Sequence, residues 1–265
     1  MKPKTIIAEP GRQLFPGLRN SFANTGEATL FTIRFFKEAF FPPFEWKELL
    51  KQCYKIGFKS FTLVAITGFI MGLVLTIQSR PTLAEFGAES WVPGMVSISL
   101  VREIAPVITA LICAGKISSG IGAELGSMKV TEQIDAMEVS GINPFKYLVV
   151  TRIAAATLMI PLLVIFADAV GIIGSYIGVN IHGEVSMRRF FDQAIFSLDF
   201  VDLIPATIKT FFFGFFIGLI GCFKGYTASS GTESVGKAAN SAVVTASLGI
   251  FIMDMLAVQI TDIFY

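Results

Sequence analysis

The sequence predicts an all-α polytopic membrane protein, in which an N-terminal interfacial amphipathic helix precedes five transmembrane helices. Of its 265 residues, 53% are hydrophobic and 26 are phenylalanine, which is more apolar material than a water-soluble core of this size buries. Five stretches are long and apolar enough to cross a hydrocarbon core, which takes about 20 helical residues. Because lipid cannot satisfy backbone polar groups, we expect these stretches to be helices.

The five predicted spans differ in the charges that they contain. The first, residues 60–79, holds none, whereas the second, residues 92–115, contains Arg102 next to Glu103. A single charge interrupts each of the others: Asp168 in residues 153–181, Lys209 in residues 203–223, and Asp254 in residues 238–261. Together the spans form a predicted membrane domain over residues 60–265.

Lysine and arginine predict the orientation of the chain, because they accumulate in short cytoplasmic loops. With the N-terminus inside, sixteen of the 21 Lys and Arg residues lie in cytoplasmic segments, and only Arg80, Arg188 and Arg189 lie in the opposite loops. We therefore predict a multi-pass protein whose N-terminus is cytoplasmic and whose C-terminus is extracytoplasmic.

The region before the first span is predicted to have two parts. Residues 1–27 are expected to form a loose cytosolic tail. In residues 28–59, apolar residues recur at helical spacing, while lysines recur every four residues on another face, as in helices that lie in the membrane surface near anionic headgroups. The alternative is a cytosolic extension of the first span. Pro42 and Pro43 would divide either version into two pieces.

Motifs for catalysis, metal binding or nucleotide binding are missing from the sequence. The three cysteines lack metal-ligand spacing, and the single histidine, His182, is interpreted as an interfacial polar residue. Residues 231–238, GTESVGKA, approach a phosphate-binding loop, but they end in Ala238 and join two apolar spans instead of a strand and a helix. We therefore predict no enzyme, no metal site and no cofactor in this chain.

Glycine spacing within the spans predicts close helix packing. In each of three glycine pairs, the two glycines are four residues apart, which is the spacing that allows helix backbones to approach closely in lipid. Such pairs favour a tight bundle that can dimerise. The pairs are Gly68 and Gly72, Gly174 and Gly178, and Gly214 and Gly218.

A charged stretch, MKVTEQIDAMEVSGINP at residues 128–144, separates the second and third spans. Thr131 as N-cap and Gly141 as C-cap predict a short helix over about residues 131–140. Its apolar face consists of Val130, Ile134 and Met137, and its acidic face of Glu132, Asp135 and Glu138. Helices on membrane surfaces are usually basic, so this acidic helix indicates a protein partner. The alternative is an amphipathic connector resting on the membrane.

Residues 100–152, LVREIAPVITALICAGKISSGIGAELGSMKVTEQIDAMEVSGINPFKYLVVTR, closely resemble the signature region of the MlaE-type permeases. These are the membrane subunits of ABC transporters that act with MCE proteins in bacterial lipid trafficking. The resemblance extends from about residue 28 to the end, and includes KGYTASSGTESVGKAANSAVV before the last span.

This resemblance implies an architecture and a set of partners. The acidic helix would be the coupling helix that docks on a cytosolic ATPase, which itself binds the ATP. The permease would be a homodimer in the bacterial inner membrane, with two ATPase subunits inside and a periplasmic MCE-domain assembly outside. Phospholipid would be the substrate, moved between the inner membrane and the MCE carrier, and no nucleic acid would be involved.

The charges within the spans indicate where such a substrate could bind. A charge at a helix centre costs about 2.5 to 3.5 kcal/mol on insertion scales, so Arg102, Glu103, Lys209 and Asp254 are expected to face the bundle interior or a wet cavity. We expect Arg102 and Glu103 to border a lipid cavity near the midplane, and Lys209 and Asp254 to pair or to act as a gate near its outer mouth. Apolar residues such as Leu75, Ile98 and Phe212 are expected to line this lipid cavity. The alternative is two structural ion pairs that lock helices together.

A different class of function also uses buried charges. An ion-coupled secondary transporter of lipids or small molecules would employ them for ion coupling, and such transporters commonly contain inverted repeats. Five spans do not divide into two equal halves, and the sequence contains no detectable internal repeat. The ATP-driven permease is therefore the favoured hypothesis.

Overall fold

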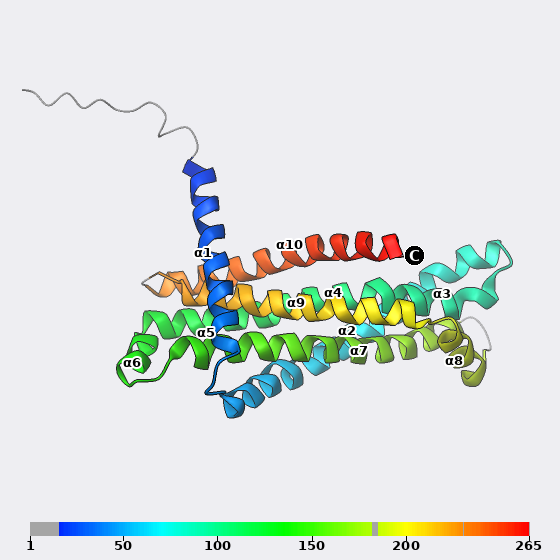
Figure 1. The fold of residues 1–265 in the computed structure, drawn as a ribbon. Coiled ribbons are helices and arrows are strands. Elements are labelled where there is room, and N and C mark those ends of the chain that lie inside the picture. The colour runs from blue at the N-terminus through cyan, green and yellow to red at the C-terminus, as the bar shows by residue number, and fades with distance from the viewer. Residues whose placement is uncertain (1–15, 182–184, 230, 265) are drawn as a thin grey trace, which may run out of the picture. The chain divides into compact units, whose positions relative to one another are not determined.

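The computed structural model describes residues 16–181, 185–229 and 231–264, and this part of the chain is helical without any strand (Figure 1). Five helical segments are long and apolar enough to cross a membrane. They are Trp46–Glu85, Glu89–Val130, Phe145–Asn180, Phe200–Tyr226 and Thr232–Ile263. The predicted all-α fold with five spans is therefore confirmed. His182, which the sequence assigned to the membrane interface, lies outside the described residues.

The chain divides into two compact units, residues 1–42 and residues 43–265. The first contains α1, Pro16–Ala39. Residues 16–27 were expected to be a tail but form the first part of this helix, which starts with a proline, a residue suited to the first helical turn. The expected boundary at residue 28 was placed where the apolar pattern of an amphipathic helix begins, but α1 itself begins earlier, at Pro16.

The second unit begins with a long helix, α2, which covers Trp46–Glu85 without a break. Residues 46–59 therefore continue directly into the first span, as in the alternative of an extended first span. At about 1.5 Å per residue, a helix of this length exceeds the thickness of a bilayer. The lysine-rich first turns of α2, residues 46–59, can therefore lie outside the hydrocarbon.

The second span is composed of several short helical segments that follow one another directly. It consists of η1 Glu89–Trp91, α3 Val92–Ser99, η2 Leu100–Ile104, α4 Ala105–Cys113, η3 Ala114–Ser118 and α5 Ser119–Val130. Both η2 and η3 are π-helical turns, and such turns inside α-helices often occur at functional sites. They carry charged residues of this span, including Arg102, Glu103 and Lys116.

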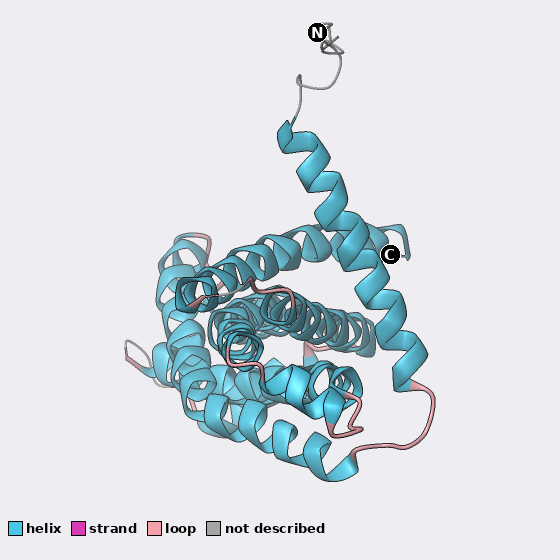
Figure 2. Cartoon of the chain, turned by 90° about the vertical axis from the view of Figure 1, so that its left-hand side faces the viewer, coloured by secondary structure: helices cyan, strands magenta, loops and turns pink. Residues whose placement is uncertain are grey.

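The remaining elements follow in the order α6 Gln133–Val139, η4 Phe145–Val150, α7 Thr151–Asn180, α8 Met187–Phe196, α9 Phe200–Tyr226 and α10 Thr232–Phe264. Helix α7 packs along α2 and α9, and α10 packs against α5 and α9. Figure 2 shows these helices of the second unit from one end of the bundle. Figure 1 shows α6 at one end and α8 with α3 at the other.

Glycines allow two of these helix pairs to approach closely. A Cβ added to Gly68 of α2 would lie 2.9 Å from the carbonyl oxygen of Ala167 in α7, and one added to Gly214 of α9 would lie 2.6 Å from that of Ala156. Both positions leave no room for a side chain, so the predicted close packing is confirmed at these glycines.

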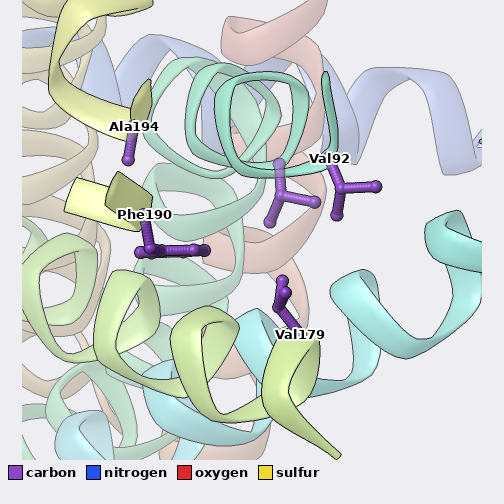
Figure 3. Packing of buried hydrophobic residues seen from close by; sticks show 5 residues of the cluster. Val92, Val179, Phe190 and Ala194 are labelled. Carbon is purple, nitrogen blue, oxygen red and sulfur yellow. The ribbon is translucent and has the colours of Figure 1, made fainter. Parts of the chain in front are cut away.

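Helix α8 closes the end of the bundle that contains α3. The Ser186 hydroxyl accepts a hydrogen bond from the Arg189 backbone N–H at 3.4 Å and caps the start of the helix. Phe190 and Ala194 of α8 pack with Val92, Val96 and Val179 in a buried cluster (Figure 3). The cluster fixes α8 across the ends of α3 and α7.

Candidate functional site

Charged residues from three spans meet at the ammonium group of Lys209. Its Nζ donates to Oε2 of Glu103 at 2.6 Å and to Oδ1 of Asp254 at 3.0 Å. The Lys209 side chain is only 7% exposed, and a buried ammonium remains charged only where acidic groups compensate it. The expected pair of Lys209 and Asp254 is present. Glu103, which was expected deeper in the membrane, bonds to the same ammonium.

The backbone of the second span changes its winding where it contributes to this site. Arg102 and Glu103 lie on the π-helical turn η2, and Pro106 follows within the first turn of α4. Proline has no N–H to donate, so the regular α-helical hydrogen bonds cannot continue through this point. On α9, Pro205 precedes Lys209 by about one turn. A proline thus lies within about one turn of the charged residues on both helices, and the second span also changes its winding there.

Arg102 forms a second group of ion pairs beside the first. Its Nη1 lies 3.7 Å from Oδ1 of Asp202, at the start of α9, and its Nη2 lies 3.5 Å from Oδ1 of Asp262, near the end of α10. The sequence reasoning missed both acids, because each falls one residue outside a predicted span. A search for charges directly flanking the spans would have found them.

These residues surround a small cavity. It is lined by Arg102, Glu103, Val201, Asp202, Pro205, Ala206, Lys209, Ala257, Val258 and Thr261. Its volume is about 20 Å³, which is room for roughly one water molecule. We call Arg102, Glu103, Asp202, Lys209, Asp254 and Asp262 the Lys209 cluster. A cavity of this volume is too small for a lipid headgroup.

The three apolar residues expected at this cavity are elsewhere. Leu75 packs against the buried cluster around Phe190, and Phe212 is 60% exposed on the surface of α9. Ile98 lines a separate groove of about 680 Å³ between α3 and α8. These residues were selected by their depth along the spans, and depth does not determine which way a helix turns each side chain.

Asp168, on α7, stays apart from the Lys209 cluster. Its Oδ1 is buried and has no hydrogen-bond partner in the described part of the chain. Residues of α4 and α9, including Pro106 and Thr210, surround it. Buried polar atoms without partners are rare in proteins, and this one lies where α7 meets α4 and α9.

The predicted acidic helix is present as α6. Ile134 is 1% exposed, and Val130 and Met137 are half-buried, whereas Glu132, Asp135 and Glu138 are exposed. The predicted division into an apolar and an acidic face is confirmed. Lys129 donates to Oδ1 of Asp135 at 2.9 Å. Val139, at the end of the helix, is 91% exposed and adds an apolar contact surface that the sequence reasoning missed.

The caps of α6 differ from the prediction at one end. Thr131 ends α5, where its hydroxyl donates to the carbonyl oxygen of Ser127 at 2.8 Å. The N-cap is Glu132, with a left-handed φ of 57°. The predicted Thr131 cap is therefore wrong, because threonine hydroxyls also bond to the preceding turn of their own helix. At the other end, Gly141 has a φ of 79°, the left-handed conformation expected of a glycine C-cap.

Residues 49–260 match the family described as Permease MlaE, and they contain most of the Lys209 cluster and all of α6. The chain belongs to the MlaE permease family. Curated relatives agree: a probable ABC transporter permease protein of Rickettsia felis is 35% identical over 242 residues, which cover 91% of this chain and 92% of that protein. A further one from Rickettsia prowazekii is 37% identical over 224 residues, 84% of this chain and 85% of that protein.

A plant protein is similar as well. The chloroplastic protein trigalactosyldiacylglycerol 1 of Arabidopsis thaliana is 34% identical over 211 residues, which cover 80% of this chain and 60% of that protein. As a member of the MlaE permease family, the chain is a multi-pass membrane permease of the ABC transporter type.

Proposed function

We propose that this MlaE-family permease moves phospholipid between its own membrane and an extracytoplasmic MCE carrier, powered by ATP that a separate cytosolic ATPase binds. The observation that carries the proposal is the Lys209 cluster, in which three spans bring charged groups together within the membrane domain. Ionisable residues in spans are costly and typically mark substrate pathways. In Figure 1 the start of α9 and the end of α10, which carry the cluster, lie at the end of the bundle away from α6.

The composition of the cluster suits a phospholipid headgroup. The guanidinium of Arg102 can bind a phosphate through two N–H groups. Four carboxylates face only two cationic groups in the cluster, so a negative charge remains for the amine of a zwitterionic headgroup. A headgroup that carries both groups could exchange partners with the existing ion pairs.

The small volume of the cavity indicates that the site opens or is completed by a second copy of the chain. Only 17% of the apolar window of α10 is buried. Large exposed apolar side chains lie along α10, namely those of Leu248, Phe251, Ile252 and Met255. A second subunit of a homodimer would bury these side chains and enclose the Lys209 cluster. The groove of about 680 Å³ beside Ile98 provides room for acyl chains or for a carrier segment at the same end.

Helix α6 is proposed to couple the permease to its ATPase. It presents three exposed acidic side chains and the exposed Val139, and Ile134 anchors it to the bundle. The names of the Rickettsia relatives as ABC transporter permeases support a separate ATP-hydrolysing partner. The name of the Arabidopsis relative is that of a glycerolipid, which supports a lipid substrate.

Photocrosslinking in proteoliposomes tests the proposal. A photoreactive residue at Val201, which lines the cavity and is 54% exposed, is compared with one at Phe212, which is 60% exposed on the same helix but away from the cavity. With the ATPase present, we expect ATP to change lipid crosslinking at position 201 and leave position 212 unchanged. Equal crosslinking with and without ATP at position 201, together with no lipid transfer, would refute the proposal.

One observation favours the ion-coupled alternative, namely the buried carboxylate oxygen of Asp168 without a partner. A protonatable group at the centre of a bundle is a typical coupling site in secondary transporters. That alternative predicts lipid movement driven by a proton gradient without ATP, and loss of this movement in Asp168→Asn. The proposed ABC mechanism predicts no transport in the absence of ATP.

A further inference from the structure

A second charged cavity lies between the N-terminal part of α2 and the η3–α5 segment. Its volume is about 140 Å³, which is room for several water molecules and hence for a phosphate group. It is lined by Gln52, Lys55, Ile56, Lys59, Ser60, Lys116, Ile117, Gly120, Ile121 and Glu124. We call this the Lys59 cavity. None of its residues belongs to the Lys209 cluster.

The acidic residue in the wall of the Lys59 cavity is already compensated. The ammonium of Lys55 donates to Oε2 of Glu124, and Nη2 of Arg152 donates to Oε1 of the same carboxylate at 2.9 Å. The Arg152 side chain is 3% exposed and is thereby held against Glu124. Two cationic groups therefore neutralise one carboxylate, which leaves the other lysines of the wall without an acidic partner.

Lys59 and Lys116 supply the remaining positive charge. Neither forms an ion pair within the residues that the structure describes. The ammonium of Lys116 donates to the backbone carbonyl oxygen of Lys59, which keeps this charge at the rim of the cavity. Both side chains are exposed, so a ligand can reach them from outside the bundle.

Ser60 gives an independent indication of a ligand. The residue is 2% exposed, lines the Lys59 cavity, and its Oγ has no hydrogen-bond partner in the described part of the chain. A buried hydroxyl without a partner is destabilising and needs an explanation. An acceptor oxygen bound in the cavity would satisfy it.

We propose that the Lys59 cavity binds the phosphate of an anionic phospholipid headgroup. Lysine ammonium groups form strong charge-assisted hydrogen bonds to phosphate, and anionic lipids attract lysines next to a span. The Ser60 hydroxyl would donate to a phosphate oxygen. The proposal adds a bound lipid to the permease and does not depend on which molecule is transported.

The surface beyond the lysines favours a lipid over a free phosphate ion. Leu63, Ile66 and Ile70 follow Lys59 at spacings of three and four residues, which places them on the same side of α2. They are 40%, 54% and 49% exposed, respectively. Acyl chains of a lipid held at Lys59 would lie along these side chains. A free phosphate ion has no apolar part that could contact this surface.

The position of the cavity suggests what the bound lipid does. Lys55 and Arg152 already link α2 and α7 to Glu124 of α5, and a phosphate bridging Lys59 and Lys116 would add a link between α2 and η3. Helix α5 leads directly into α6. We expect the lipid to stabilise the part of the bundle that supports α6.

Delipidated, purified full-length permease in detergent allows a direct test. Its thermal unfolding midpoint is measured with added phosphatidylglycerol, phosphatidylcholine or inorganic phosphate. Phosphatidylglycerol is expected to raise the midpoint most. The double variant Lys59→Ala/Lys116→Ala should bind this lipid at least about ten-fold more weakly, because it loses two charge-assisted hydrogen bonds. The matched control Lys47→Ala/Lys237→Ala removes two exposed lysines elsewhere and should behave like the wild type.

Ser60→Ala separates binding from folding. In the lipid-free protein it should raise the unfolding midpoint, since it removes an unsatisfied buried hydroxyl, yet it should reduce the increase that phosphatidylglycerol causes. Lys59→Arg/Lys116→Arg keeps the charge and should retain most of that increase.

Three results would overturn the proposal. The first is an equal response of the alanine double variant and the wild type to phosphatidylglycerol. The second is an equal stabilisation by phosphatidylcholine, which has no net charge. The third is full stabilisation by inorganic phosphate alone, which would make the ligand a soluble phosphate and not a lipid.

Discussion

The Lys209 cluster and helix α6 are both rich in charge but are built in opposite ways. In the cluster, the Lys209 side chain is 7% exposed and lies within hydrogen-bonding distance of two carboxylates. On α6 the three acidic side chains are exposed. Of these three, only Asp135 forms an ion pair with a cationic residue in the described part of the chain. The charges of the cluster form ion pairs with one another, whereas two of the three acidic side chains of α6 form none among the described residues.

Because of this difference, we expect the Lys209 cluster to contribute to the stability of the bundle and α6 to the recognition of a partner. Buried charges that neutralise one another hold helices in register, and removing one leaves the others uncompensated. Exposed charges contribute little to stability, because water and salt screen them, but they can attract a partner of opposite charge. Substitution of a single charge in the cluster should therefore affect folding as well as transport, whereas reversal of the acidic side chains on α6 should affect only the binding of the ATPase.

The largest expected effect is that of Lys209→Met. It leaves Glu103 and Asp254 without their shared cation and should lower the free energy of unfolding by about 3–5 kcal/mol, as for other buried ion pairs that lose one partner. Chemical unfolding in detergent measures it. The control Lys237→Met removes an exposed pair with Glu233 and should cost less than about 1 kcal/mol. An equal loss in both variants would contradict the distinction between buried and exposed charges.

Reversal of the acidic face of α6 should leave stability unchanged but weaken assembly. The triple variant Glu132→Lys/Asp135→Lys/Glu138→Lys should bind the ATPase roughly ten-fold or more weakly, since each lost surface pair is worth about 0.2–1 kcal/mol. Titration with purified ATPase measures this affinity. As a control, Glu85→Lys/Glu89→Lys/Asp192→Lys reverses three exposed acids at the other end of the bundle. Wild-type affinity in the α6 variant would exclude this face as the docking site.

Glu132→Gly should produce a smaller effect, with opposite signs for stability and binding. Glu132 has a φ of 57°, which is costly for a residue with a side chain but not for glycine. We expect this variant to be more stable by about 1 kcal/mol and to bind the ATPase more weakly. Glu138→Gly, within the helix, loses the same charge but should be destabilised by about 1 kcal/mol. Destabilisation of both variants would show that the Glu132 backbone is not strained.

Cysteine labelling perturbs the protein least and tests whether the two regions face opposite sides. In a variant without the three native cysteines, Glu138→Cys and Glu89→Cys replace exposed glutamates at the two ends. An impermeant thiol reagent added outside intact cells should label position 89 and leave position 138 unlabelled. The reverse pattern would place α6 outside, away from any cytosolic ATPase.

The fold could be predicted from the sequence because hydrocarbon imposes long apolar helices, and their charges and glycines stand out against that background. The pair of Lys209 and Asp254 followed from the cost of isolated charges in lipid. Leu75 and Phe212 were misplaced, because the hydropathy of a span does not fix its rotation about the helix axis. The strained Glu132 cap could not be predicted, since its conformation depends on how α5 ends and where Ile134 is buried.

The central claim is that the Lys209 cluster acts in transport and does not merely lock the helices together. The measurement is ATP-driven transfer of labelled phospholipid from proteoliposomes to the MCE carrier by the variant Lys209→Met/Glu103→Gln/Asp254→Asn. These substitutions remove the charges together, so no buried charge of the three is left unpaired and the fold should persist. We predict wild-type binding of the ATPase, with lipid transfer reduced to the level seen without ATP. Transfer at the wild-type rate would contradict the account and make the cluster structural.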